Sequence, residues 1–155
     1  MASGQMDVQG LRELNEKLGE LSNELAGKAL YSALNVALTP VVKEAKQRAL
    51  VAREPHVMNG ITVQPGLLAD SIRKKRLPKS ESVGEFAQGA AMGVFVGKGK
   101  TQKLYPRYWH FIENGTSKMA ATPFMRPAFD NNIDVMIDRF KEKLAKNIEK
   151  YAGRS

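Results

Sequence analysis

The sequence predicts an α+β fold with N-terminal helices, a small antiparallel sheet with an extended hairpin, and a long C-terminal helix. Apolar residues recur at helical spacing near both ends of the chain. Between these ends, short β-branched runs alternate with Gly and Pro, as in short strands joined by turns. Helices that flank two or three strands favour a small antiparallel sheet.

The chain of 155 residues is expected to form one domain with three successive parts. A chain of this length can bury a substantial core without disulfide bonds. Its apolar share of 43% and its charged share of 26% are ordinary for a globular protein. The parts are a helical segment at 1–54, a sheet with basic loops at 55–103, and a motif with the last helix at 104–155.

The residue content excludes several classes of site. The absence of Cys removes disulfides, thiolate catalysis and Cys-ligated metal centres. The two His stand 54 residues apart, so we expect no metal site and no cofactor. No apolar run approaches the roughly 18–20 residues of a membrane helix. The start, MASGQMDVQG, lacks the basic head and apolar core of a signal peptide, so we expect synthesis in the cytoplasm and no membrane association.

The first part has two apolar stripes at helical spacing. Leucines recur three and four residues apart in the first stripe, which predicts an amphipathic helix packed on its own domain or on a neighbour. Asp7 is expected to cap this helix and Gly27 to end it. A second helix is expected from Lys28 to Ala52, with a kink or two abutting helices at Pro40. The leucines of the first stripe are Leu11, Leu14, Leu18, Leu21 and Leu25.

The middle part is expected to hold the strands. The stretch REPHVMNGITVQPG has turn dipeptides and little periodicity, which predicts an irregular connection. LLADSIRKKRLP is expected to begin as a helical turn and to continue as an exposed strand at Ser71–Leu77, which Pro78 ends. Val94–Val96 predicts a further strand, and GKGKTQK after it predicts a basic, flexible hairpin tip. KSESVGEFAQGAA, before that strand, is expected to be a flexible link.

The last part predicts a short helix at Tyr105–Asn114 and a long helix from about Pro127 to Tyr151. On the charged face of the long helix, Glu142 and Lys146 stand at the spacing of an ion pair. Pro127 suits the first turn of a helix because its missing N–H has no partner there. The apolar stripe of the long helix consists of Phe129, Ile133, Met136 or Ile137, Phe140, Leu144 and Ile148.

Positive charge is concentrated in the middle of the chain. The net charge is +8, and residues 61–107 alone carry nine basic and three acidic side chains, a net charge of +6. Such a surplus can face nucleic acid, an acidic protein or water. A patch on neighbouring strands would bind phosphates without sequence preference and with strong salt dependence. The candidate residues for contact with DNA or an acidic partner are Arg73, Lys74, Lys75, Arg76, Lys98, Lys100 and Lys103.

Two stretches invite an enzymatic interpretation, and neither has a complete motif. His110 and Glu113 stand three residues apart and could share a helical face, but nothing near them supplies a defined nucleophile. Ser117 has no G-x-S-x-G elbow around it. GKGKTQK lacks both the first Gly and the following helix of a phosphate-binding loop. We therefore expect no catalytic residue.

The stretch 108–130, YWHFIENGTSKMAATPFMRPAFD, is dense in aromatic, turn-forming and proline residues. It resembles the Y-x-x-F-x-E-x-G-T-S-x-M-x-A-x-P-F-x-R-P-A signature of the gene-product-ten-like family of tailed-bacteriophage tail completion, or head–tail joining, proteins. Upstream, Gly66-x-Leu68-x-x-Ser71-Ile72 is similar to the G-x-L-x-x-S-I element of that family. The order of helices, strand, motif and final helix also fits, so the resemblance spans nearly the whole chain. The stretched middle, LPKSESVGEFAQGAA, departs from the family pattern.

The resemblance implies a structural virion protein of the phage neck, with no enzymatic activity and no cofactor. Members are expected to form a ring of identical subunits, here a hexamer, between a head-side connector or stopper protein and the tail terminator or tube protein. Packaged DNA would pass through the lumen of the ring. The protein would be made in the cytoplasm of the bacterial host and end in the virion. Two alternatives stay open, a tail terminator ring and a nonspecific double-stranded DNA-binding protein.

Under this resemblance the motif is expected to form a rigid corner that also contacts other subunits. Gly115 would permit a sharp turn, and Thr116 or Ser117 would hydrogen-bond the backbone of that turn. Two prolines would stiffen the entry into the last helix, and Arg126 would pair with Glu113. The residues expected to serve fold or subunit contact are Tyr108, Phe111, Glu113, Gly115, Thr116, Ser117, Met119, Pro123, Phe124, Arg126 and Pro127.

Overall fold

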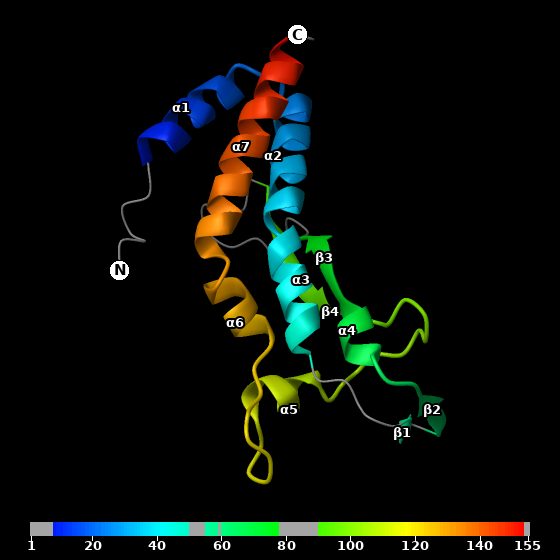
Figure 1. The fold of residues 1–155 in the computed structure, drawn as a ribbon. Coiled ribbons are helices and arrows are strands. Elements are labelled where there is room, and N and C mark those ends of the chain that lie inside the picture. The colour runs from blue at the N-terminus through cyan, green and yellow to red at the C-terminus, as the bar shows by residue number, and fades with distance from the viewer. Residues whose placement is uncertain (1–7, 50–54, 59, 78–89, 154–155) are drawn as a thin grey trace. The chain divides into compact units, whose positions relative to one another are not determined.

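The computed structural model describes residues 8–49, 55–58, 60–77 and 90–153, and it confirms the α+β class (Figure 1). The chain groups into two compact units. Unit 1 takes its residues from Met1–Thr39, Arg76–Gly93 and Ile133–Ser155, and unit 2 from Pro40–Lys75 and Val94–Asn132. In chain order the elements are α1 (Val8–Gly19), α2 (Asn23–Ala37), α3 (Thr39–Arg48), β1 (His56–Met58), β2 (Ile61–Val63), α4 (Leu67–Ser71), β3 (Ile72–Arg76), β4 (Met92–Val96), α5 (Trp109–Asn114), α6 (Met125–Asp130) and α7 (Ile133–Ala152).

Unit 1 is built on the packing of α2 against α7, which lie side by side in Figure 1. Small side chains on α2, Ala29 and Ala33, are fully buried and let the two helices approach closely. The buried Asn147 of α7 donates its Nδ2–H to the Ala29 carbonyl at 3.2 Å, so its polar group is satisfied inside the core. The core is completed by Leu14, Leu18, Leu21, Leu25, Ala26, Leu30, Phe140, Leu144, Ile148 and Tyr151.

The first predicted helix boundary was wrong. The chain breaks between α1 and α2, at residues 20–22, whereas Gly27 lies inside α2. Ser22 explains the earlier break, because its Oγ accepts the Leu25 N–H at 3.3 Å and so caps α2. The expected cap Asp7 and the expected helix end at 50–52 lie outside the described residues.

The expected interruption at Pro40 is confirmed, because α2 ends at Ala37 and α3 begins at Thr39. Pro40 is the second residue of α3, where its missing N–H breaks no helical hydrogen bond. The Thr39 hydroxyl donates to the Asn35 carbonyl at 3.1 Å, which satisfies an acceptor at the end of α2.

The combined stretch Asn23–Arg48 corrects the expectation that no segment is long and apolar enough to cross a membrane. By length and composition alone this stretch could do so, with a mean hydropathy of 1.3 over its most apolar window. The core helix of a globular protein has the same composition, and the α2 residues Ala29, Ala33 and Ala37 are buried inside the protein. The stretch is therefore weak support for a membrane partner.

Among the described residues, two two-stranded sheets replace the one small sheet expected. β1 and β2 form an antiparallel hairpin in which His56 pairs with Val63 and Met58 with Ile61, so the predicted irregular connection was wrong here. Gly60, with φ of 78°, supplies the left-handed backbone of its turn. The predicted helical turn and strand at 67–77 are confirmed as α4 and β3.

The second sheet pairs β3 with β4, which confirms the strand predicted at Val94–Val96 and extends it to Met92. The Gly97 N–H donates to the Ser71 carbonyl and the Leu77 N–H to the Ala91 carbonyl, both at 2.9 Å. Because the two bonds join opposite ends of the strands, the pairing is antiparallel. Pro78 and most of the expected link at 79–91 lie outside the described residues.

Unit 2 contains the largest fully buried side chains among the described residues. They come from α3, β2, α4, β3 and the segment around α5 and α6, so this core joins parts of the chain that are far apart in sequence. These residues are Val41, Val63, Leu67, Leu68, Ser71, Ile72, Pro106 and Phe124.

The predicted start of the long C-terminal helix at Pro127 was wrong. The chain breaks at Asn131 and Asn132, between α6 and α7. The Asn132 side chain donates to the Ala128 carbonyl at 2.7 Å and competes with the helical backbone. Both Asn side chains also donate to the Glu44 carboxylate of α3. A local hydrogen-bond network thus ends α6, and α7 carries the helix on to Ala152.

The short helix α5 begins at Trp109, four residues later than predicted. Pro106 contributes to the late start, because the residue before a proline, here Tyr105, is disfavoured in the helical backbone region. The Trp109 N–H then donates to the Pro106 carbonyl at 3.0 Å and opens the helix.

Candidate functional site

The motif folds into a corner between α5 and α6, and Glu113 connects the two helices. Its carboxylate accepts three backbone N–H groups at the start of α6: Phe124 at 2.8 Å, and Met125 and Arg126 at 3.0 Å. The first N–H groups of a helix have no partner within the helix. A charged acceptor there satisfies them and also opposes the positive end of the helix dipole.

Opposing effects act on the pKa of the Glu113 carboxyl. Burial raises it, whereas the three backbone N–H groups and the positive charge of Arg126 lower it. The lowering effects prevail, so the pKa lies below its ordinary value and the group is ionised at neutral pH. Arg126 was predicted to pair with Glu113, and the hydrogen bond between the two residues comes from the Arg126 backbone N–H.

Gly115 ends α5 in a conformation that few other residues adopt, with φ of 74°. A Cβ atom at this position would lie 2.7 Å from the Ala121 nitrogen and 3.0 Å from the Met119 carbonyl oxygen. The glycine is therefore required for two reasons, its backbone angle and the close passage of the returning chain.

The turn after Gly115 is closed by hydrogen bonds of its own. Thr116 and Met119 exchange backbone hydrogen bonds of 2.8 and 3.3 Å, and the Thr116 hydroxyl accepts the Lys118 N–H at 3.2 Å. The Thr122 N–H then donates to the Ile112 carbonyl at 2.8 Å, which fastens the returning chain to α5. Of the two hydroxyls predicted to bond the turn, Thr116 does so.

Aromatic packing fixes the corner from the inside. Phe124 is fully buried, and its ring meets the Trp109 ring edge-on at a centroid distance of 6.4 Å. The Trp109 Nε1–H donates to the Tyr105 hydroxyl at 2.8 Å. The half-buried Tyr108 precedes α5, and burial raises the pKa of its hydroxyl.

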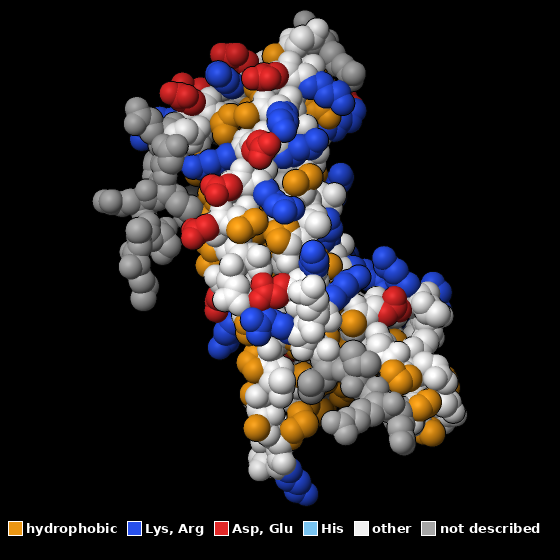
Figure 2. Space-filling view, viewed as in Figure 1, with side chains coloured by type: hydrophobic (Ala, Val, Ile, Leu, Met, Phe, Trp, Pro, Cys, Tyr) orange, Lys and Arg blue, Asp and Glu red, His pale blue; other side chains and the backbone are white. Residues whose placement is uncertain are grey.

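Two large apolar side chains of the motif point outward from this fixed corner. Phe111 is 56% exposed and Met119 42% exposed, although both adjoin residues held by hydrogen bonds. In Figure 2 hydrophobic side chains gather on the visible face of unit 2. Ser117, Pro123 and Arg126 are also exposed, whereas Pro127 is half-buried in the first turn of α6 and not in the first turn of the long helix α7, where it was predicted.

The site geometry assigns Glu113 a structural task. Both of its carboxylate oxygens accept backbone N–H groups. The exposed His110 ring lies against the Trp109 ring, with 3.7 Å between the two ring centroids. Among the residues that the structure describes, no group of three His, Asp or Glu could hold a metal ion.

The predicted basic residues have different surroundings. The Arg73 guanidinium donates to the Lys98 carbonyl in unit 2, and the Arg76 guanidinium stacks over the Tyr31 ring at 4.2 Å in unit 1. Lys74 is half-buried, and burial lowers the pKa of its ammonium group. The exposed lysines of the set are Lys75, Lys98, Lys100 and Lys103.

The Gly/Lys-rich loop at 97–103 is anchored, so the prediction of a flexible tip was wrong. Asp70 of α4 accepts the Thr101 N–H at 3.1 Å. Gly99 is buried, and a Cβ there would lie 2.7 Å from the Leu67 side chain. The Gly99 N–H also donates to the Leu104 carbonyl at 2.8 Å. The sequence signal for this contact was Gly99 in the second Gly-Lys pair, because the absence of a side chain lets the loop approach α4 there.

The G-x-L-x-x-S-I element supplies the other side of that contact. Gly66 precedes α4 with φ of 92°, and Leu68, Ser71 and Ile72 are buried. The Ser71 hydroxyl donates to the Leu67 carbonyl at 2.6 Å, so the buried polar group is satisfied. The element therefore fixes α4 and β3 in the core of unit 2.

The sequence was compared with known proteins. Residues 12–115 match a family model described as "Bacteriophage HK97-gp10, putative tail-component". The match covers more than half of the chain and ends at the glycine of the corner. Searches among curated proteins and among solved structures gave no match.

Replacing Glu113 by Gln tests the connection between α5 and α6. We expect E113Q to lower the free energy of unfolding at neutral pH by about 1–3 kcal/mol, because the N–H donors of α6 lose a charged acceptor. The depressed pKa makes this contribution fully present above the unfolded-state pKa, and it is lost as the pH falls through the folded-state pKa. Urea denaturation at neutral pH and at about pH 3 measures the effect.

The difference between wild type and E113Q should therefore shrink in acid. Glu24→Gln is the control, because its side chain is 78% exposed and pairs with Lys28 on the surface of α2. That control should leave the urea midpoint of unfolding nearly unchanged, because exposed ion pairs contribute little to stability. Equal stability of wild type and E113Q at neutral pH would contradict the structural task of Glu113.

Replacing Gly115 by Ala tests the close passage of the chain. Gly66→Ala is the matched control, because Gly66 also has a positive φ, but a Cβ added to it would have no atom within 4 Å. Both variants carry a backbone strain of about 1 kcal/mol, and Gly115→Ala adds a collision with backbone atoms. The midpoint temperature of thermal unfolding should therefore be highest for wild type, lower for Gly66→Ala and lowest for Gly115→Ala. The reverse order of the two variants would refute the contact.

Proposed function

Because this chain belongs to the HK97-gp10-like family of bacteriophage tail components, we propose that it is the tail completion subunit that joins head and tail as a ring. The family membership itself makes the chain a structural component of a phage tail, in a family of assembly proteins and not of enzymes. The ring, its place in the neck and the partners are the proposal.

The single observation that best supports the proposal is the outward apolar pair on the rigid corner. Phe111 and Met119 are 56% and 42% exposed, yet the backbone that carries them is fastened by Glu113, Gly115 and Thr116. Ordering these side chains on binding costs little entropy because their support is already fixed. Exposed aromatic and Met side chains on a fixed support are typical of the centre of a protein interface.

Further exposed apolar side chains extend the area of unit 2 available for subunit contact. Val57 and Ile61 on the β1–β2 hairpin are 70% and 50% exposed, and Phe95 on β4 is 37% exposed. A closed ring needs heterologous contacts, in which two different surfaces of the same subunit meet. We expect a hexamer whose two faces contact the head-side connector or stopper protein and the tail terminator or tube protein.

The exposed lysines support a lumen that faces packaged DNA. Lys98, Lys100 and Lys103 lie on the loop that Asp70 anchors, so their charges occupy a fixed segment of backbone. Cations at fixed positions interact with passing phosphates without reading the sequence. The same observation favours the second candidate function, nonspecific binding of double-stranded DNA by the isolated protein.

Deletion of the gene from the phage that encodes this chain tests the function. We expect lysates with filled heads and separate tails that do not join, and infectivity restored by the chain supplied from a plasmid. Electron microscopy of the lysate distinguishes this result from tails of abnormal length, which would indicate a tail terminator. Normal infectious particles without the gene would sink the proposal.

Replacing Phe111 by Ser tests the outward apolar side chain without disturbing the core. Because Phe111 is exposed, the free energy of unfolding should change by less than about 1 kcal/mol. Loss of an aromatic anchor should lower complementation of the deletion phage by at least about tenfold. Asn114→Ser, exposed on the same helix, should complement normally. Full complementation by Phe111→Ser would show that this side chain makes no subunit contact.

A further inference from the structure

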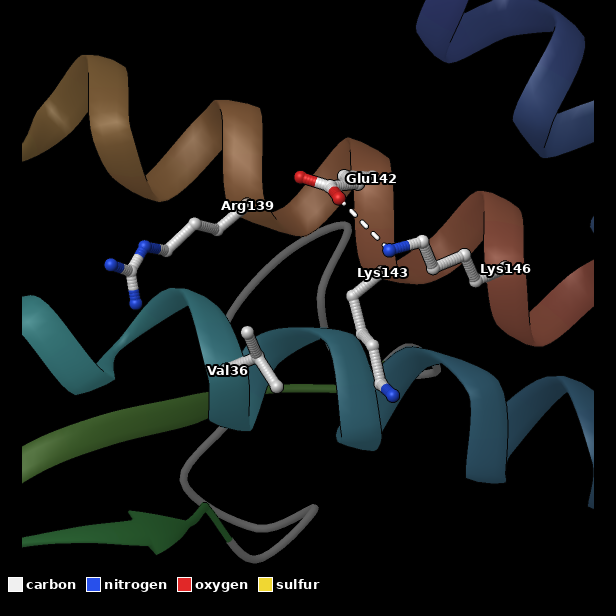
Figure 3. A pocket seen from close by; sticks show the side chains of 5 residues that line it. All are labelled: Val36, Arg139, Glu142, Lys143 and Lys146. Atoms are coloured by element: carbon white, nitrogen blue, oxygen red, sulfur yellow. Dashed lines mark hydrogen bonds and ion pairs between the residues drawn. The ribbon is translucent and has the colours of Figure 1, made fainter.

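A hollow of about 350 Å³ on unit 1 concentrates positive charge outside the predicted set of basic contact residues (Figure 3). It lies between α2 and α7 and is lined by Val36, Arg139, Glu142, Lys143 and Lys146. Glu142 pairs with Lys146 at 2.9 Å, so one carboxylate faces three cations. The hollow therefore carries a net positive charge.

The cations of this hollow form a row along α7. Arg139, Lys143 and Lys146 follow one another at spacings of four and three residues, which places them on one side of a helix. At 1.5 Å per residue the row is roughly 10 Å long. A partner that fits it needs negative charges over a similar length.

The chain carries such a row of carboxylates on α1 and on the turn that directly follows it. Glu13, Glu16 and Glu20 are exposed and follow one another at spacings of three and four residues, so this row is also roughly 10 Å long. In the part of the chain that the structure describes, these carboxylates have no ion-pair partner. Leu14 and Leu18 lie on the other side of α1 and pack against the core of unit 1. The glutamates therefore face away from that core.

We propose that the basic hollow of one subunit binds the acidic face of α1 of a neighbouring copy. This inference rests on the proposed ring, and it names a contact that would close that ring. The two surfaces lie on different helices of the same chain, so the contact is heterologous, as a ring requires. Complementary charge fixes the register of such a contact and disfavours wrong partners.

A second copy fits the hollow better than DNA does. Glu142 lies among the cations and would repel a row of phosphates. Two exposed cations border the glutamates, Arg12 one helical turn before Glu16 and Lys17 one helical turn from both Glu13 and Glu20, so the row keeps a net charge of one negative unit. That lysine offers Glu142 a partner of opposite charge, which a nucleic acid cannot do.

Disulfide trapping tests this contact directly. The native chain has no Cys, so any covalent multimer must come from introduced residues. Particles of the deletion phage are to be assembled with Glu16→Cys/Lys143→Cys, or with either single variant, and then oxidised. We expect the double variant to give dimers and larger multimers that reductant returns to monomers, and each single variant to stay monomeric.

Other outcomes of the trapping overturn the inference. Monomers alone from particles that contain the double variant would show that the two helices do not meet. Dimers from the Glu16→Cys single variant would indicate a symmetric contact of another kind. Infectious particles that lack the chain altogether would refute the proposed function as well, so the two failures can be told apart.

Charge reversal provides a second measurement that does not depend on the cysteines. Reversal of either row should lower complementation by at least about tenfold, because several ion pairs become repulsions. Reversal of both rows together should restore complementation. Full activity of either single-row variant, or no rescue by the combination, would contradict the contact. The two sets are Glu13→Lys/Glu16→Lys/Glu20→Lys and Arg139→Glu/Lys143→Glu/Lys146→Glu.

Discussion

The corner of unit 2 depends on one interaction, the capture of three backbone N–H groups of α6 by the Glu113 carboxylate. Without an acceptor, these donors would be left unpaired at a partly buried helix start, which is costly. Because the acceptor lies on α5, satisfying them also fixes the path between the two helices. Gly115 then permits the tight return, and the fully buried Phe124 fills the space behind it.

The sequence predicted the helices near both ends of the chain better than it predicted the residues at which those helices begin and end. The leucine stripe and the α7 stripe have the period of a helix, and both contribute to the core of unit 1. The breaks at Ser22 and at Asn132 were missed because each depends on a side chain that bonds the backbone nearby. Such bonds compete closely with helix continuation, and tertiary partners such as Glu44 decide the outcome.

At the candidate site, the motif predicted which residues matter but not what each one does. Glu113 first suggested acid–base chemistry beside His110, and then a pairing with Arg126. The structure shows an acceptor of backbone N–H groups, which no residue pattern distinguishes from an ion pair. The anchored loop at Gly99 was also missed, because its contact with Asp70 and Leu67 joins segments about thirty residues apart.

The motif divides into residues that hold the corner and residues that the corner presents. Glu113, Gly115 and Phe124 are occupied by internal bonds or burial, so they have little surface left for a partner. Phe111 and Met119 contribute little to the core and remain exposed. In the proposed ring this division would be useful, because a fixed backbone lowers the entropy lost on docking. Apolar anchors on unit 2 would then supply most of the affinity, while charged rows on unit 1 would select the register.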